Sequence, residues 1–196
     1  MPACHGTAAL HFRTGQVLVT VITGLLVLAR SASALDPQKE ITQYAHRVWR
    51  EDSGLPANFT GPLAQTTDGY IWLGTPAGLV RFDGVQFQRF PLREVPGIGG
   101  NAVYTLAAGL DGSLWIGAAN GLVRYKDGGF QSFHGQYGMP NAPVFALTAD
   151  NSGNLWLGTP HGLGKWNGRE FHLYTTQDGL PSNDVRAVSA NPGGDV

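Results

Sequence analysis

Short apolar segments alternate with glycine-rich turns along most of the chain. The apolar runs are brief and lack the 3.6-residue period of an amphipathic helix, which favours strands over helices. Asp83-Gly84, Asp127-Gly128 and Asn167-Gly168 tolerate positive φ angles and therefore predict hairpin turns. The expected strands lie at 70–74, 79–82, 85–90, 102–108, 122–125, 129–133, 144–149, 163–166 and 170–174.

The same unit occurs three times. DGYIWLGT (68–75) recurs as DGSLWIGA (111–118) and as SGNLWLGT (152–159), with the tryptophans 43 and 41 residues apart. Glycine-leucine dipeptides and aromatic residues downstream keep the same offsets. Four short strands in a repeat of this length are typical of one blade of a β-propeller.

The expected fold class is therefore all-β, a partial β-propeller over residues 44–196. Three complete four-stranded blades are expected at about 58–90, 101–133 and 142–174, and a fourth begins at 183–196. Residues 44–50 are expected to form an orphan N-terminal outer strand, and residues 184–190 a C-terminal inner strand. Rings have about four to eight blades, so we expect an N-terminal part of a longer protein. Closure of the ring by an oligomer is the alternative.

The first 34 residues have a different pattern. His5, His11 and Arg13 precede a 13-residue apolar run at 17–29, and small residues follow it. This order predicts a signal peptide at 1–34, cleaved after Ala34, and a linker at 35–43. The run is shorter than the roughly 20 residues of a membrane span, although an uncleaved anchor is the alternative.

Composition narrows the function classes. Glycine accounts for 28 of 196 residues, aromatic residues for 10% and charged residues for only 14%, with a formal net charge of −1. These values exclude a coiled coil, a charged disordered tail and a basic nucleic-acid-binding protein. Cys4 is the single cysteine, so the chain has no intramolecular disulfide.

Residues that recur in every unit are expected to be scaffold. Glycine permits the turn, and tryptophan buries a large area between neighbouring blades. This structural set comprises Gly69, Trp72, Gly74, Gly112, Trp115, Gly117, Gly153, Trp156 and Gly158.

Ligand contacts are instead expected where the units differ. In propellers, the loops between blades share one face with the turns between the second and third strands. Polar residues there suit hydrogen bonding and stacking with neutral ligands such as sugars. The candidates for ligand binding are Arg93, Asn101, Asn120, Tyr137, Asn141, His161 and Asn183. The sequence shows no metal-ligand spacing, paired acid–base set or cofactor motif, so no catalytic residue, metal or cofactor is expected.

Residues 51–90 closely resemble the opening of the two-component regulator propeller family. The family repeat, W-I-G-T-x-x-G-L, is matched at 72–79, 115–122 and 156–163, and GLPSNDV at 179–185 is similar to its inter-blade segment. The chain departs from this pattern at Ala118-Ala119 and at 97–100, GIGG.

The resemblance implies an extracytoplasmic sensor module in the periplasm. Its parent would be anchored in the inner membrane, with a histidine kinase, a diguanylate cyclase or a DNA-binding regulator as output. The resemblance also implies a carbohydrate-derived ligand and a homodimer. The other expected partners are the downstream blades and sensor domains of the parent chain, and nucleic acid is not expected to bind. The output module is not recognisable in these 196 residues, so no enzymatic activity is expected. A secreted propeller enzyme of the lyase or sialidase-like kind and a protein-interaction propeller are the alternatives.

Overall fold

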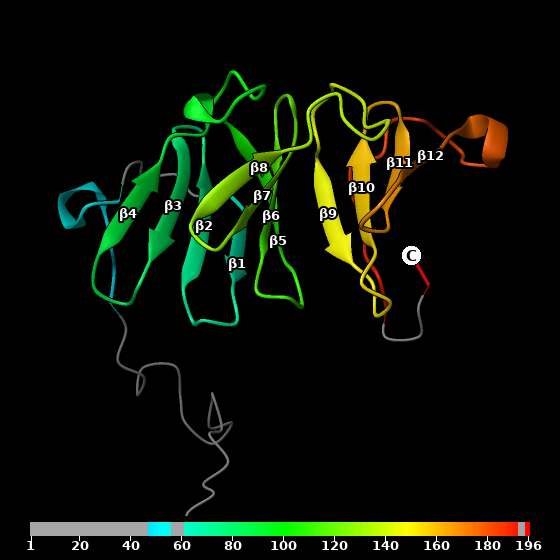
Figure 1. Cartoon of the computed structure of the whole chain (residues 1–196). Coiled ribbons are helices and arrows are strands. Elements are labelled where there is room, and N and C mark those ends of the chain that lie inside the picture. The colour runs from blue at the N-terminus through cyan, green and yellow to red at the C-terminus, as the bar shows by residue number, and fades with distance from the viewer. Residues whose placement is uncertain (1–46, 56–60, 192–194) are drawn as a thin grey trace, which may run out of the picture. The chain divides into compact units, whose positions relative to one another are not determined.

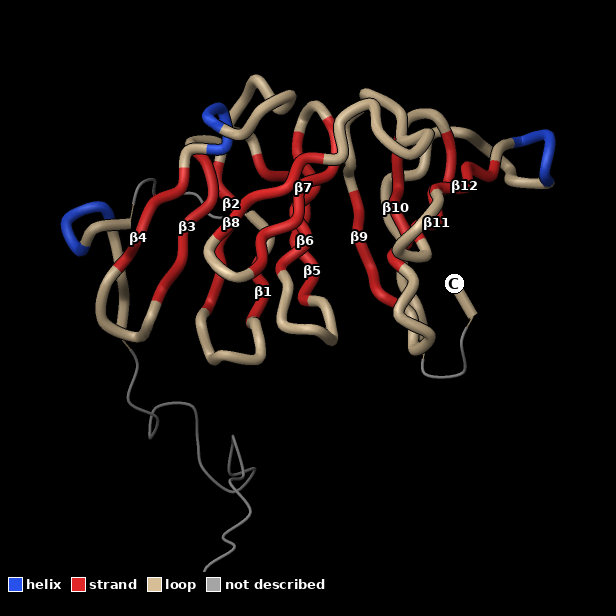
Figure 2. The backbone as a smooth tube through the Cα atoms, viewed as in Figure 1, coloured by secondary structure: helices blue, strands red, loops and turns tan. Residues whose placement is uncertain are grey.

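The computed structural model describes residues 47–55, 61–191 and 195–196. The predicted signal peptide and linker lie outside these residues. Nearly all regular structure in the described part is strand, and helix is limited to three short 3₁₀ turns (Figure 2). These turns are η2 (Glu51–Ser53), η3 (Leu92–Glu94) and η4 (Thr176–Asp178).

In the described part of the chain, twelve strands form three separate antiparallel sheets, each following the order of the chain. The first sheet contains β1 (Leu63–Gln65), β2 (Ile71–Thr75), β3 (Gly78–Phe82) and β4 (Phe87–Phe90). The second contains β5 (Val103–Ala108), β6 (Leu114–Ala118), β7 (Gly121–Lys126) and β8 (Gly129–Ser132). The third contains β9 (Ala146–Ala149), β10 (Leu155–Thr159), β11 (Gly162–Trp166) and β12 (Phe171–Tyr174). The three predicted blades are thereby confirmed, and they stand side by side in Figure 1.

The glycine-leucine turns set the register between the second and third strands of each blade. Thr75 pairs with Gly78, Ala118 with Gly121 and Thr159 with Gly162. The three glycines have φ angles of 134°, 135° and 143°, which favour glycine because it has no side chain. The departure at Ala118-Ala119 leaves this register unchanged.

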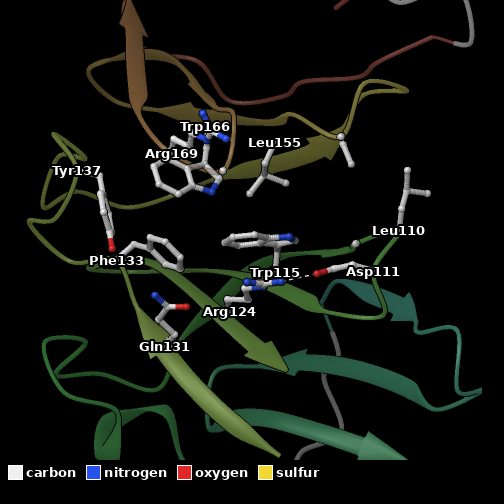
Figure 3. Close-up of a pocket in the computed structure, with 14 residues that line it drawn as sticks. Leu110, Asp111, Trp115, Arg124, Gln131, Phe133, Tyr137, Leu155, Trp166 and Arg169 are labelled. Carbon is white, nitrogen blue, oxygen red and sulfur yellow. Dashed lines mark hydrogen bonds and ion pairs between the residues drawn. The ribbon is translucent and has the colours of Figure 1, made fainter. Parts of the chain in front are cut away.

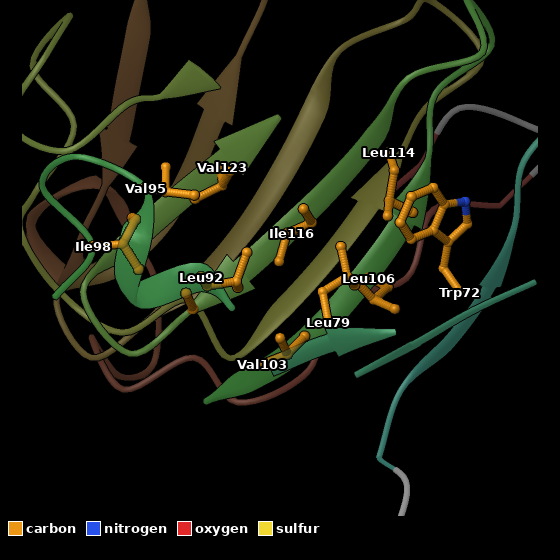
Figure 4. Close-up of a cluster of buried hydrophobic side chains, with 11 residues drawn as sticks. Trp72, Leu79, Leu92, Val95, Ile98, Val103, Leu106, Leu114, Ile116 and Val123 are labelled. Atoms are coloured by element: carbon orange, nitrogen blue, oxygen red, sulfur yellow. The ribbon is translucent and has the colours of Figure 1, made fainter. Parts of the chain in front are cut away.

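Hydrophobic clusters lie at the two interfaces between adjacent sheets. The first cluster joins Trp72 and Leu79 of the first sheet to Leu114 and Ile116 of the second (Figure 4). A second cluster includes Leu122 of the second sheet, Phe133 directly after it, and Leu147, Leu155 and Trp166 of the third sheet. Burial of these faces is the main favourable contribution to the packing of the blades.

The glycine of each WLG motif lies close to the segment where the next blade begins, at Val103, Val144 and Val185. A Cβ atom placed on Gly117 would be 2.7 Å from the carbonyl oxygen of Val144, and one on Gly158 equally close to that of Val185. Real Cβ atoms do not approach a backbone oxygen this closely. The scaffold role predicted for these glycines thus has a specific cause, the close approach of successive blades.

The described parts of the two predicted terminal strands form no strand. Residues 47–50, the described part of the segment expected at 44–50, contain no strand. Trp49 instead packs edge-on against Phe82, with ring centroids 5.0 Å apart. The segment is expected to complete the last blade of the ring, and the inner strands of such a blade are not among the described residues.

The C-terminal segment expected at 184–190 also lacks strand pairing. The backbone N–H of Val185 nevertheless donates to the carbonyl of Thr159 at 3.0 Å, just as that of Val144 donates to Ala118 at 3.1 Å. Val185 thus occupies the position where a new blade begins. Without a second strand to pair with in the described part, the segment forms no ladder.

The turn that precedes β10 gives a prediction about acid stability. The carboxylate of Asp150 accepts hydrogen bonds from the backbone of Ser152 and from Asn154 and Trp156, all at 2.8–2.9 Å. Burial opposes ionisation, but these bonds outweigh it and hold the pKa of Asp150 below its ordinary value of 3.8.

Folded Asp150 therefore takes up a proton less readily than unfolded Asp150. The stabilisation is present above pH 3.8 and is lost as the pH falls through and below this value. Asp150→Asn is expected to reduce the free energy of unfolding at neutral pH and to flatten its decline in acid. Urea unfolding between neutral pH and about pH 3 measures both effects. An equally steep decline in the variant would contradict this assignment.

Candidate functional site

The loops predicted to carry the ligand site do share one face of the blades. The side chain of Asn120, in the turn between β6 and β7, donates to the carbonyl of Ile98 at 2.7 Å. Gly97 lies against His134, so close that an added Cβ would be 3.1 Å from that of His134. Loops between blades and turns between the second and third strands therefore meet, as the repeat predicts.

The side chains of two candidate asparagines accept hydrogen bonds from backbone N–H groups in these loops. Asn101 accepts a hydrogen bond from the backbone N–H of Arg93 at 3.0 Å, and Asn183 accepts one from that of Thr176 at 2.8 Å. They occupy equivalent positions in two repeats and hold equivalent loops, at η3 and η4. This geometry gives both a scaffold role, while their contact with a ligand stays a prediction.

The remaining candidates are exposed and spread along the loops. Arg93, Asn120, Asn141 and His161 lie at the surface. The backbone N–H of His161 donates to the hydroxyl of Thr159 at 3.1 Å. Apart from the contacts above, the structure does not bring these side chains together into one polar cluster in its described part, and their binding role also stays a prediction.

Tyr137 differs from the other candidates because it lines a pocket. It has a φ angle of 55°, unusual for a residue other than glycine, and its side chain is 52% exposed. Its ring lies 5.1 Å from that of Trp166 and 6.0 Å from that of Phe133, measured between centroids.

This pocket lies between the second and third blades and has a volume of about 420 Å³ (Figure 3). Trp115, Arg124 and Gln131 contribute from the second sheet, and Leu155 and Trp166 from the third. The turns at 109–111 and 168–169 also line it, at the strand ends opposite the glycine-leucine turns. The pocket thus extends along the interface, from the predicted loop face to the opposite one.

Asp111 is the acidic residue of the pocket lining, and cationic side chains neutralise it. It forms an ion pair with Arg124 (Figure 3), and Lys126 and Ser113 donate to it at 2.9 and 2.6 Å. Burial raises the pKa of Asp111, but the bonds from Lys126 and Ser113 and the charge of Arg124 outweigh this and hold it far below the ordinary value. Asp111 is therefore ionised and serves as a counter-ion.

Sequence reasoning did not select Trp115, Arg124, Trp166 and Arg169, which line the pocket with Tyr137. Trp115 was assigned to the scaffold because it recurs in every repeat. One signal in the sequence could have pointed to this pocket. Gly164 occupies the repeat position that Val80 and Val123 hold in the first two repeats.

Two further features bear on chemistry. The described residues contain no group of three or more histidine, cysteine, aspartate or glutamate side chains arranged to hold a metal ion. Among the same residues, none of the helices has the length and apolar character needed to cross a membrane.

Three packed four-stranded blades define a β-propeller protein. A family model, that of the two component regulator propeller, matches residues 138–161. The match runs from the connection before the third blade through its WLG motif. No curated protein matches the chain.

Solved structures share the fold. The extracellular domain of a putative hybrid two component system from B. thetaiotaomicron aligns with a TM-score of 0.66 and 24% identity, over 76% of this chain and 22% of that one. A second such domain from B. thetaiotaomicron aligns with a TM-score of 0.60 and 23% identity, over 71% of this chain and 20% of that one. Virginiamycin B lyase from Staphylococcus aureus, solved with quinupristin, aligns with a TM-score of 0.53 and 20% identity, over 68% of this chain and 46% of that one. The chain therefore spans only about a fifth of the length of the two extracellular domains.

Proposed function

We propose that this chain is a ligand-sensing propeller module of a bacterial two-component sensor, located outside the cytoplasm. The two component regulator propeller repeat carries the proposal. The fold shared with extracellular domains of hybrid two component systems supports it. The fold shared with a lyase does not favour an enzyme, because blades of this kind serve unrelated functions.

The proposed parent is secreted into the periplasm by the signal peptide at 1–34 and anchored in the inner membrane. A histidine kinase or a diguanylate cyclase supplies the output. A carbohydrate-derived ligand binds at the loop face, and a homodimer transmits the signal. Such a ligand shifts the output only as far as its affinity differs between two arrangements of the dimer.

The location is tested by fusing alkaline phosphatase after Val196, because this enzyme becomes active only outside the cytoplasm. We expect active phosphatase, and a control fusion that lacks residues 1–34 should be inactive. Inactive phosphatase in the fusion to the full chain would overturn the proposed location.

Sensing is tested in the gene that encodes the chain, by in-frame deletion of residues 61–191. In the host strain grown on a panel of oligosaccharides, we expect the deletion to abolish ligand-dependent transcription and to leave basal transcription intact. A response that persists in full after the deletion would contradict a sensing role.

A further inference from the structure

The two interfaces between blades are built from equivalent residues but are closed to different extents. At the first interface, Trp72 is 1% exposed and its ring lies 4.9 Å from that of Tyr125 on the next blade. At the second interface, the equivalent residues are Trp115 and Trp166, and the 420 Å³ pocket lies between them (Figure 3). Trp115 is only half-buried as a result.

A single difference between the repeats accounts for much of this opening. In the second blade, Val123 is buried, and the ring of Phe130 packs 4.9 Å from Tyr125 and 5.7 Å from Phe90 of the preceding blade. In the third blade, glycine replaces this valine. The ring of Phe171, equivalent to Phe130, lies directly over Gly164, where any Cβ would collide with it.

Phe171 is consequently drawn away from the place that Phe130 fills at the first interface. It lines a separate small void with Leu122, Met139 and Leu157, and it is not part of the lining of the large pocket. The open space beside Trp166 is thus specified by Gly164 and does not result from general looseness between blades.

Aromatic side chains form the walls of this pocket. Trp115 and Trp166 lie on opposite sides of it, and Phe133 and Tyr137 are at one end (Figure 3). Aromatic surfaces on two sides favour a planar ring, which can pack against them by stacking or edge-on. A volume of about 420 Å³ lies within the range of small-molecule sites.

The charge of the pocket is positive although the chain carries a formal net charge of −1. Arg124 and Arg169 line it, and Lys126 binds Asp111 from beside it. Asp111 is the acidic residue of the lining, and it is paired with Arg124 and Lys126. The buried Nε of Arg124 has no hydrogen-bond partner among the described residues. A negatively charged acceptor group on a ligand would compensate the excess positive charge of this lining.

We propose that the pocket between the second and third blades binds a planar aromatic carboxylate. The ring stacks between Trp115 and Trp166, and the carboxylate faces Arg124 and Arg169. A neutral sugar fits the site less well, because it leaves the positive charge uncompensated and lacks a flat ring to fill the space between the indoles. This site lies between the blades and reaches the loop face at Tyr137, and the proposal does not depend on a signalling role.

The test uses the purified full chain titrated with ferulate, an aromatic carboxylate, and with methyl ferulate, its neutral ester. Calorimetry reports binding, and quenching of tryptophan fluorescence reports stacking. We expect ferulate to bind at least about tenfold more tightly than the ester, the effect of a charge-assisted hydrogen bond. Equal affinities, absence of ferulate binding at millimolar concentration, or binding of cellobiose in its place would overturn the proposal.

Three variants locate the site. Arg169→Gln should weaken ferulate binding about tenfold. Gly164→Val should abolish it, because the valine displaces Phe171 towards the pocket. Lys165→Gln is the matched control, since Lys165 lies 5.0 Å over the ring of Trp156 on the opposite face of the third blade. Circular dichroism checks that each variant is folded, and Arg169→Gln decides if Gly164→Val does not fold. Unchanged affinity in Arg169→Gln, or an equal loss in Lys165→Gln, would place the ligand elsewhere.

Binding here is measured on the isolated chain without any signalling output. A failed titration therefore leaves the proposed sensing role intact, and a failed deletion experiment in the host leaves the pocket intact.

Discussion

Replacing Trp72 with alanine is expected to lower the free energy of unfolding by about 3–5 kcal/mol, the cost typical of a fully buried aromatic residue. Trp72 is 1% exposed, and its ring contacts Phe90 at 5.6 Å and Tyr125 of the next blade at 4.9 Å. Its indole N–H donates to the hydroxyl of Thr66 at 2.9 Å. Alanine would remove contacts from both blades and leave this buried hydroxyl without its donor.

Trp156→Ala is the matched control, because Trp156 occupies the same place in the third repeat. It is half-buried, its ring lies 6.0 Å from that of Tyr174 in the same blade, and its indole N–H is bound by Asp150. No later blade covers it in the described part of the chain. Its loss should therefore cost less, about 1–2 kcal/mol. Urea unfolding followed by circular dichroism gives both values, and equal losses would show that the interface between blades is not what stabilises Trp72.

The repeat made the blades predictable from sequence because local and global signals agree there. In each unit, positive-φ glycines fix the turns and the alternation of apolar residues fixes which face is buried. The terminal segments were predicted by the same repeat but lack the neighbouring strands that would pair with them. Residues 47–50 and 184–190 show that a strand pattern requires a partner strand to form a ladder.

The pocket was not predictable from the repeat, because identical residues occupy different environments. Trp72 and Trp115 have the same motif and the same register, yet one is sealed and the other lines a cavity. The difference originates in Gly164, because the ring of Phe171 lies over this glycine and leaves the space beside Trp166 open. Comparison of the three repeats shows that Gly164 is unusual. Only the packing shows that the ring of Phe171 occupies the space left by the missing side chain.

The turn between β10 and β11 carries the second large expected effect. Gly162 has a φ angle of 143°, a conformation that alanine adopts only with strain of about 1–3 kcal/mol. An added Cβ would also collide with the carbonyl oxygen of Tyr174 on the neighbouring strand. Relief of this clash requires the backbones of β11 and β12 to separate, and overpacking of this kind costs about 1–3 kcal/mol. Gly162→Ala should therefore destabilise the chain by about 3–5 kcal/mol.

Gly153→Ala separates the two contributions. Gly153 has a φ angle of 81°, and an added Cβ would meet no atom within 4 Å. This variant retains the conformational strain without the collision, so it should cost only about 1–2 kcal/mol. Unfolding in urea measures the difference between the two variants. If both lose the same amount, the left-handed backbone alone explains why glycine is needed, and the close approach of β12 to the turn contributes nothing. A larger loss in Gly162→Ala means that this glycine is required by the spacing of the strands as well as by the conformation of the turn.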